Sequence, residues 1–147
     1  MRLFLDTNVL MDFLVHDRPN SYYSTLIFET VKKSSLEAWM TTQSIIDAAY
    51  IVGRYKGYVL ENFRNNIRDI LRFVNVGGMS FFDLKDAINA SEIDDIEDCA
   101  QAFFAEDNHC DIIITSDKDF RIPNKMEPTP VMTPKAFLDH LRAVHPL

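Results

Sequence analysis

One stretch of the sequence decides the fold class: Ile112-Ile113-Ile114-Thr115-Ser116-Asp117-Lys118-Asp119. Its three isoleucines are β-branched and apolar, so residues 112–115 predict a strand that is buried on both faces. Strands of this kind belong to parallel sheets that are covered by helices on each side. The polar residues that follow are therefore expected at the carboxyl end of a parallel strand, where such sheets bind their ligands.

The rest of the sequence alternates short apolar runs with segments of helical periodicity. Further strands are expected at residues 3–5, 38–42, 73–76 and 131–132. Helices are expected at residues 8–14, 21–31, 44–55, 59–74, 83–90, 96–108 and from Pro134 onward. The 44–55 helix is apolar nearly all round, which predicts that it is buried. This alternation predicts one α/β domain over residues 1–147, a three-layer α/β/α sandwich with a mostly parallel sheet of about four to five strands.

The charge balance limits the partners of this chain. Its 147 residues include 15 Lys and Arg against 22 Asp and Glu, which gives a net charge of −7. A broad nonspecific grip on nucleic acid is therefore not expected. Aspartate outnumbers glutamate by 15 to 7, and aspartate favours caps, turns and metal sites, whereas glutamate suits helix surfaces. The excess of aspartate directs attention to the ends of strands and the starts of helices.

The positions of the cysteines and the N-terminal residues indicate the cellular compartment of the protein. Cys99 and Cys110 form no C-x-x-C pair and have no histidine at zinc-finger spacing, so neither a disulfide scaffold nor structural zinc is indicated. The apolar run at residues 3–5 reaches Asp6 too soon for a signal peptide or a membrane span. These features predict a reduced, cytoplasmic protein with no membrane association.

Carboxylates follow two of the predicted strands and begin two of the predicted helices. Asp6 follows the first strand, Asp117 follows the 112–115 strand, and Asp47 and Asp98 lie in the first turns of helices. If these acids meet at one edge of the sheet, their mutual repulsion requires cations among them. Oxygen ligands without histidine or thiolate indicate Mg²⁺ or Mn²⁺. Such a site is suited to phosphoryl chemistry.

Each acid also has an ordinary structural explanation. Asp6 can cap the helix that begins near Asn8, and Asp47 stands three residues after Ser44, which is the spacing of a capping box. Asp98 can be a first-turn acid that the helix dipole favours. Either Asp117 or Asp119 can cap a turn that ends at Phe120. Each acid alone is weak evidence for a site, so the prediction rests on their joint pattern.

Three motifs, in this order along the chain, resemble those of the PIN domain family. They are Leu5-Asp6-Thr7-Asn8-Val9-Leu10, Asp95-Ile96-Glu97-Asp98-Cys99-Ala100 and Ile113-Ile114-Thr115-Ser116-Asp117-Lys118-Asp119-Phe120. Within that family, the chain is most similar to the small bacterial VapC-type proteins, the toxins of toxin–antitoxin pairs. The resemblance implies a parallel sheet flanked by helices and a ring of acids that binds Mg²⁺ or Mn²⁺ and hydrolyses RNA.

The resemblance also implies roles for individual residues. Asp6, Asp98 and Asp117 match metal-binding acids, and Asp47 stands where the family usually has glutamate, which shortens its reach by one methylene. The residues implied to support this site are Asn8, Thr115, Asp119 and Asp95. An RNA substrate, a homodimer and a small antitoxin that blocks the acidic site are the implied partners. The alternative is a PIN-fold protein that binds RNA or a partner with little or no turnover.

Two other α/β classes with clustered acids fit the sequence less well. A phosphoacceptor receiver domain needs an acidic pair after its first strand and an aspartate after its third, where this chain has Asp6 alone and Gly77-Gly78. A haloacid-dehalogenase-like phosphatase needs Asp-x-Asp at the first corner, where Asn8 replaces the second aspartate.

A row of arginines offers contacts for RNA phosphates. Arg64, Arg68 and Arg72 recur every four residues along the predicted 59–74 helix. A solvated helix face is the more common explanation of such a row, and contact with RNA phosphates or an acidic partner is the more specific one. Arg64 and Arg68 are therefore candidate substrate contacts without further support from the sequence.

Overall fold

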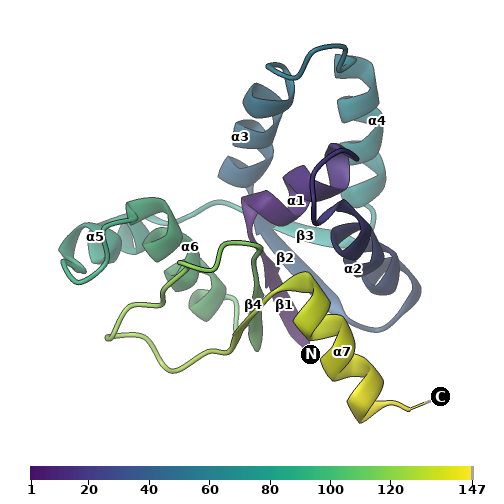
Figure 1. Cartoon of the computed structure of the whole chain (residues 1–147). Helices are drawn as coiled ribbons and strands as arrows, with labels where there is room; N and C mark the ends of the chain where they lie inside the picture. Colours follow the sequence, from purple (N-terminus) through teal and green to yellow (C-terminus); the bar gives the residue numbers. More distant parts are fainter. Residues whose placement is uncertain (147) are drawn as a thin grey trace.

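The computed structural model describes residues 1–146 and arranges them as helices around a central sheet (Figure 1). The strands are β1 (Arg2–Leu5), β2 (Glu37–Thr41), β3 (Val74–Gly77), β4 (Ile112–Ile114) and β5 (Val131–Met132). The helices are α1 (Thr7–Leu14), α2 (Ser21–Lys33), α3 (Thr42–Val52), α4 (Leu60–Ile70), α5 (Phe81–Asn89), α6 (Ile96–Asp107) and α7 (Pro134–Val144).

All strands of the sheet are parallel and lie in the order β3-β2-β1-β4-β5. The α/β class and the parallel sheet are thus confirmed, with five strands. β4 pairs with the central strand β1, so that Leu5 lies opposite Ile114. The backbone N–H of Asp6 donates to the carbonyl of Ile114 at 3.0 Å, which fixes the end of β1 beside the end of β4. This register places the residues that follow both strands at one edge of the sheet.

The sheet separates two apolar cores, as the alternation of side chains along a strand requires. Leu3 and Leu5 face one core, which α1, α2, α3, α4 and α7 cover. Phe4 and Ile113 face the other core, which α5 and α6 cover. Figure 1 shows α5 and α6 on the opposite side of the sheet from α1 and α2. All three isoleucines of β4 are buried, as expected for a strand covered on both faces.

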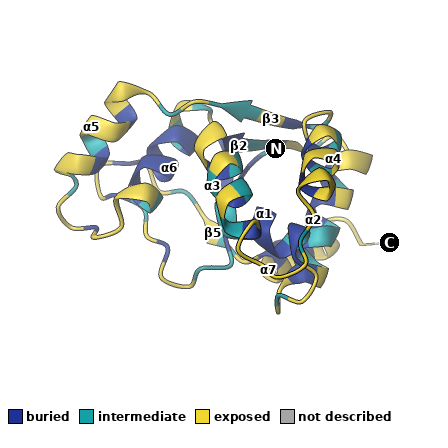
Figure 2. Cartoon of the chain, turned by 90° about the horizontal axis from the view of Figure 1, so that it is seen from above, coloured by how far each residue is buried: buried dark blue, intermediate teal, exposed yellow. Residues whose placement is uncertain are grey.

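The prediction that the 44–55 helix is buried was wrong. α3 spans Thr42–Val52 and exposes 65% of both Ile46 and Tyr50, while Ser44, Ala48 and Val52 face inward. The physical reason is that α3 and α4 extend together beyond the sheet edge, so that only one face of α3 meets the core (Figures 1 and 2).

Other boundaries shift where capping or pairing overrides periodicity. The predicted 59–74 helix ends at Ile70, because residues 74–77 pair with β2 as strand β3. α5 begins at Phe81 rather than residue 83, because Ser80 and Asp83 form a capping box. Among residues 1–146, no helix has the length and hydrophobicity needed to cross a membrane.

Candidate functional site

Asp6 lies at the centre of the candidate site, in the corner between β1 and α1. Its side chain is only 5% exposed and accepts hydrogen bonds from the Thr7 N–H at 2.7 Å and from Thr115 Oγ1 at 2.7 Å. It also accepts one from Asn8 Nδ2 at 3.1 Å. Asp6 is therefore the N-cap of α1, as its ordinary explanation predicted, and it is held rigidly by α1 and by the residue after β4.

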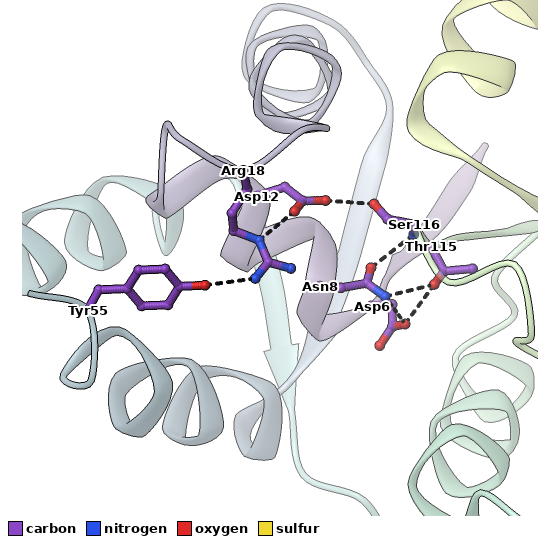
Figure 3. Close-up of polar contacts among 7 residues, drawn as sticks. All are labelled: Asp6, Asn8, Asp12, Arg18, Tyr55, Thr115 and Ser116. Carbon is purple, nitrogen blue, oxygen red and sulfur yellow. Dashed lines mark hydrogen bonds and ion pairs between the residues drawn. The ribbon is translucent and has the colours of Figure 1, made fainter.

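Asn8 and Thr115 join α1 to the segment that carries Asp117. Asn8 Nδ2 donates to Thr115 Oγ1 at 3.2 Å, and Asn8 Oδ1 accepts from the Ser116 N–H at 2.9 Å. The Asp117 N–H donates to Thr115 Oγ1 at 3.0 Å (Figure 3 shows the Asp6, Asn8, Thr115 and Ser116 side of this network). The structure thus brings Asn8 and Thr115 together with Asp6.

α6 brings a second carboxylate toward Asp6. Asp95 is the N-cap of α6 and accepts from the Asp98 N–H at 3.0 Å, so Asp95 fixes the start of the helix. The Asp98 side chain is half-buried. Burial, then the charges of Asp6, Asp95, Asp117 and Glu97, raises the pKa of Asp98 to about 7. Asp98 therefore lies in the field of acids from β1, β4 and its own helix.

The pKa of Asp6 is raised as well. Burial is the largest cause, and the charges of Asp117 and Asp95 add to it, whereas the hydrogen bonds from Thr115 and Thr7 lower it. Because Asp117 acts on both Asp6 and Asp98, these side chains share one negative field. Carboxylates in such a field are the groups whose ionisation a bound cation would favour most.

Asp117 and Asp119 border a small hollow beside this field. The hollow has a volume of about 230 Å³ and is lined by Ile93, Asp94, Asp95, Asp98, Asp117, Asp119 and Arg121. The Asp119 N–H donates to Asp117 Oδ1 at 2.9 Å, which closes the turn before Phe120. Asp117 is half-buried and Asp119 is exposed. Asp119 therefore stands at the outer margin of the acidic group.

Asp47 lies on α3 and differs from expectation in two respects. Its carboxylate accepts from Gln43 Nε2 at 2.8 Å, and neither residue is buried. The expected capping box with Ser44 does not form, because Thr41 is the N-cap of α3 and accepts from the Ser44 N–H at 2.9 Å. The expected burial of the 44–55 helix also fails at Asp47, because this face of α3 is only partly covered.

Glu97 is an acid of the site that the sequence analysis did not single out. Burial, followed by the charges of Asp47, Asp6 and Asp95, raises its pKa. Glu97 therefore lies within the electrostatic influence of Asp47 on α3 and of Asp6, which follows β1. Its place directly before Asp98 in the first turn of α6 was the available signal, but a helix surface explains such a glutamate equally well.

A buried polar cluster joins three helices behind these acids. Thr7 Oγ1 donates to Ser44 Oγ at 2.7 Å, and Gln101 Nε2 donates to both hydroxyl oxygens at 3.2 Å. Gln101 is 1% exposed and also contacts Glu97 Oε1 at 3.5 Å. This cluster sets the spacing of α1, α3 and α6, and no motif in the sequence indicated it.

A second polar network, also not found from the sequence, leads away from the site (Figure 3). Ser116 Oγ donates to Asp12 Oδ2 at 2.7 Å, and Arg18 Nε donates to Asp12 Oδ1 at 2.7 Å. Arg18 Nη1 also donates to the Tyr55 hydroxyl at 3.1 Å. Asp12 is 2% exposed, so this carboxylate is a buried anion with a guanidinium partner. The network connects the residue before Asp117 to the loop after α3.

The arginines of α4 lie away from the acidic group. Arg64 is exposed, and Arg68 pairs with Glu61 at 3.3 Å and with Asn65 Oδ1 at 2.9 Å. Both candidate substrate contacts are thus at the surface of α4, and one of them already has an acidic partner.

The donor set at the acidic edge consists of carboxylate, hydroxyl and amide oxygens. Mg²⁺ and Mn²⁺ prefer such ligands, so the residues present fit a hard divalent cation. Across residues 1–146, no three acidic, histidine or cysteine side chains already meet at metal-binding distances. What the structure shows is therefore the convergence of charge rather than a complete coordination shell.

The fold and its acidic edge define a class of small α/β domains that gather aspartates where parallel strands end. Residues 2–119 match the family model of the PIN domain. The chain belongs to the PIN domain family.

A solved structure supports the same fold. VapC20 from Mycobacterium tuberculosis, described as a toxin that cleaves the sarcin–ricin loop, superposes with a TM-score of 0.64 at 13% sequence identity. The match covers 80% of this chain and 92% of VapC20. None of the curated proteins matches this chain significantly in sequence.

Proposed function

We propose that this chain is a metal-dependent endoribonuclease that hydrolyses RNA phosphodiester bonds at the acidic edge of its sheet. One observation carries the proposal: Asp6, Asp98 and Asp117 come from three elements into one negative field, where burial first, and then the charges of neighbours that include Asp6 and Asp117, raise the pKa of Asp98 to about 7. Membership of the PIN domain family, whose members are typically nucleases that use divalent metals, supports it.

The roles of the residues follow from their contacts. Asp6, Asp98 and Asp117 would hold Mg²⁺ or Mn²⁺, which when bound would polarise a phosphodiester and make a nearby water more acidic. Thr115 and Asn8 orient the Asp6 carboxylate by donating to Oδ2. Asp95 fixes the start of α6 and hence the position of Asp98. Asp47 and Glu97 add negative charge from α3 and α6, and Asp119 from the outer margin.

The proposed partners follow from the same site. The likeness to a VapC toxin favours a role as the toxin of a toxin–antitoxin pair in the cytoplasm, and a homodimer. A small antitoxin would block the acidic edge most effectively by placing an arginine among the carboxylates, because a guanidinium pairs with them in two parallel hydrogen bonds.

Cleavage of several structured and single-stranded RNAs with Mn²⁺ tests the proposal. The variants Asp6→Asn and Asp98→Asn keep the shape of each side chain but lose its charge, so each is expected to lower the cleavage rate by about 100-fold or more. Asp139→Asn, on the exposed face of α7, is the matched control and should cleave like wild type. Equal activity in all proteins would point to a contaminating nuclease and contradict the proposal.

Binding of Mn²⁺, measured by calorimetry without RNA, helps to distinguish the ribonuclease from a PIN-fold protein that binds RNA or a partner without cleaving RNA. Asp98→Asn should weaken Mn²⁺ binding strongly, and Glu97→Gln by about tenfold, as is usual for residues that support metal ligands. Tight Mn²⁺ binding with no cleavage of any RNA would favour the binding protein. Asp47 in place of glutamate is the feature of this chain that favours that outcome.

A further inference from the structure

A second hollow, larger than the acidic one, lies between the end of α1, the loop joining α3 to α4, and the first turns of α4. Its volume is about 490 Å³. We call it the α1–α4 hollow, and its lining includes His16, Tyr55, Lys56, Tyr58, Asn62 and Asn66. It shares no lining residue with the acidic hollow.

The lining combines aromatic rings with side-chain amides. Asn62, Asn65 and Asn66 follow one another at helical spacing, so one face of α4 presents amides to the hollow. Asn65 is engaged by Arg68. The buried Tyr58 hydroxyl lies beside Asn66, without a hydrogen bond of standard geometry to any described residue. An aromatic face with nearby amides is the combination that recognises an unpaired base by stacking and by its edge.

The charge around this hollow differs from that of the whole molecule. The net charge of the chain is −7, yet residues 48–60 contain no acid and two basic residues, Arg54 and Lys56. Both are exposed, and the loop after α1 adds His16 and one carboxylate, that of Asp17, to the lining of the hollow. The exposed cations of the α3–α4 loop, beside an aromatic and amide lining, suit a nucleotide, whose phosphate stays near solvent while its base enters.

The hollow is connected rigidly to the acidic edge. Tyr55, on its wall, accepts from Arg18, and Arg18 and Ser116 both donate to Asp12 (Figure 3). The 11 residues of α3 span roughly 16 Å at about 1.5 Å per residue. An RNA strand bound at the acidic edge therefore reaches this hollow with a neighbouring nucleotide rather than with the one that is cleaved.

We propose that the α1–α4 hollow binds one unpaired nucleotide of the RNA, with Tyr55 or Tyr58 stacking on the base, Asn62 and Asn66 reading its edge, and Lys56 contacting its phosphate. The proposal deepens the ribonuclease assignment and rests on it for the identity of the ligand. It also gives this negatively charged chain a place to hold RNA beyond the acidic edge.

Binding of the four nucleoside monophosphates to the full chain in EDTA tests the proposal. EDTA removes divalent cations, so capture of the phosphate at the acidic edge is excluded. At least one nucleotide is expected to bind about tenfold more tightly than ribose 5-phosphate, because stacking and edge contacts require the base. Equal affinity for the nucleotides and for ribose 5-phosphate would overturn the proposal.

Variants locate the binding. Asn62→Ala and Asn66→Ala are expected to weaken nucleotide binding by about tenfold, while Asn89→Ala, an exposed amide on α5, should leave it unchanged. Lys56→Ala, at an exposed loop position, gives an independent variant if Asn66→Ala unfolds. If Asn62→Ala and Lys56→Ala both bind nucleotide like wild type, the site is elsewhere and the proposal is wrong.

Cleavage assays on the same proteins distinguish this proposal from the ribonuclease assignment. Asn62→Ala should raise the KM for RNA and leave kcat nearly unchanged, because the hollow holds RNA away from the reacting phosphate. Cleavage with an unchanged KM would overturn the subsite while the ribonuclease stands. Nucleotide binding that depends on Asn62, in a chain that cleaves no RNA, would support the subsite while the ribonuclease assignment fails.

Discussion

Asp12 is a buried charge that holds two parts of the structure together. It is 2% exposed, accepts from Arg18 and Ser116, and so connects α1 to the segment that carries Asp117. Because a buried carboxylate without a cation is costly, Arg18→Met should lower the free energy of unfolding by about 2–4 kcal/mol. Asp12→Asn should cost only about 1 kcal/mol, since an amide still meets both partners. Denaturant unfolding at neutral pH measures both changes.

The double variant Asp12→Asn/Arg18→Met provides the control. With the charge of residue 12 removed, the loss of the guanidinium should cost much less than in wild type, so the two changes should not add. Strict additivity, or a larger loss for Asp12→Asn than for Arg18→Met, would mean that Asp12 is not held as a buried anion.

At the residue scale, the sequence predicts the acids that follow strands better than those inside helices. Asp6 and Asp117 were found because a parallel strand delivers the next residue to a known edge of the sheet. Asp12 and Gln101 were missed because both lie within helices, where sequence spacing alone does not show which polar residue turns toward another element. Arg18, the partner of Asp12, lies in the loop after α1, and Ser44, a partner of Gln101, belongs to another helix.

At Gly77, the last residue of β3, the backbone of the strand lies close to α6. A Cβ at this position would lie 3.3 Å from the ring of Phe104 on α6, whereas at Gly78 the nearest atom is Thr42 Oγ1 at 4.0 Å. Phe104 is buried against Phe4, so its ring has little room to move. Gly77→Ala should therefore destabilise the protein by about 1–2 kcal/mol, and Gly78→Ala should stay within about 0.5 kcal/mol of wild type. Thermal or denaturant unfolding compares them, and equal effects would contradict this packing.

α5 and α6 meet through a pair of carboxyl groups. Asp83 is 4% exposed, and a hydrogen bond to it, with burial as the second cause, raises the pKa of Asp107 from 3.8 to about 7. Asp107 thus keeps its proton in the folded chain at pH values where the unfolded chain has lost it. The free energy of unfolding therefore falls as pH rises between about 4 and 7 because of this group.

Asp107→Asn should remove this part of the pH dependence. The amide donates to Asp83 at every pH, so the Tm of the variant should exceed that of wild type at about pH 8 by about 2 °C or more. The difference should shrink toward about pH 5. Glu127→Gln, an exposed acid in the loop before β5, is the control. A Tm difference that is the same at both pH values would show that Asp107 does not hold a proton against Asp83.

At the element scale, strands and the sheet were predictable, while the exposure of α3 was not. The apolar residues Ile46 and Tyr50 suggest burial, but the extension of α3 and α4 beyond the sheet leaves them in solvent. Similarly, periodicity alone set the start of α5 too late, because the capping box of Ser80 and Asp83 adds a turn. The exposure of α3 depends on where the helix lies relative to the sheet, which local spacing does not contain, whereas the capping-box spacing of Ser80 and Asp83 is present in the sequence.

The whole molecule separates its charges. The net charge of −7 includes the acids that converge at the end of the sheet, whereas Arg54, Lys56 and Arg64 are exposed basic residues of the α3–α4 region. A protein of this net charge is expected to bind RNA only through such a local basic surface. The excess of aspartate noted in the composition is thus in part a property of one edge rather than of the whole surface.

This separation of charge predicts how the affinity for RNA depends on salt concentration. Each contact with a phosphate of single-stranded RNA contributes about −0.7 to the slope of the logarithm of the binding constant against the logarithm of the salt concentration. Three contacts therefore predict a slope of about −2. The binding is measured in EDTA, which suppresses cleavage. Arg64→Ala should make the slope shallower by about 0.7. Arg68→Ala, on the same helix, should change it less, because Glu61 already pairs with Arg68. If both variants keep the wild-type slope, α4 does not face the RNA, and the phosphate contacts must come from the loop at residues 53–59 alone.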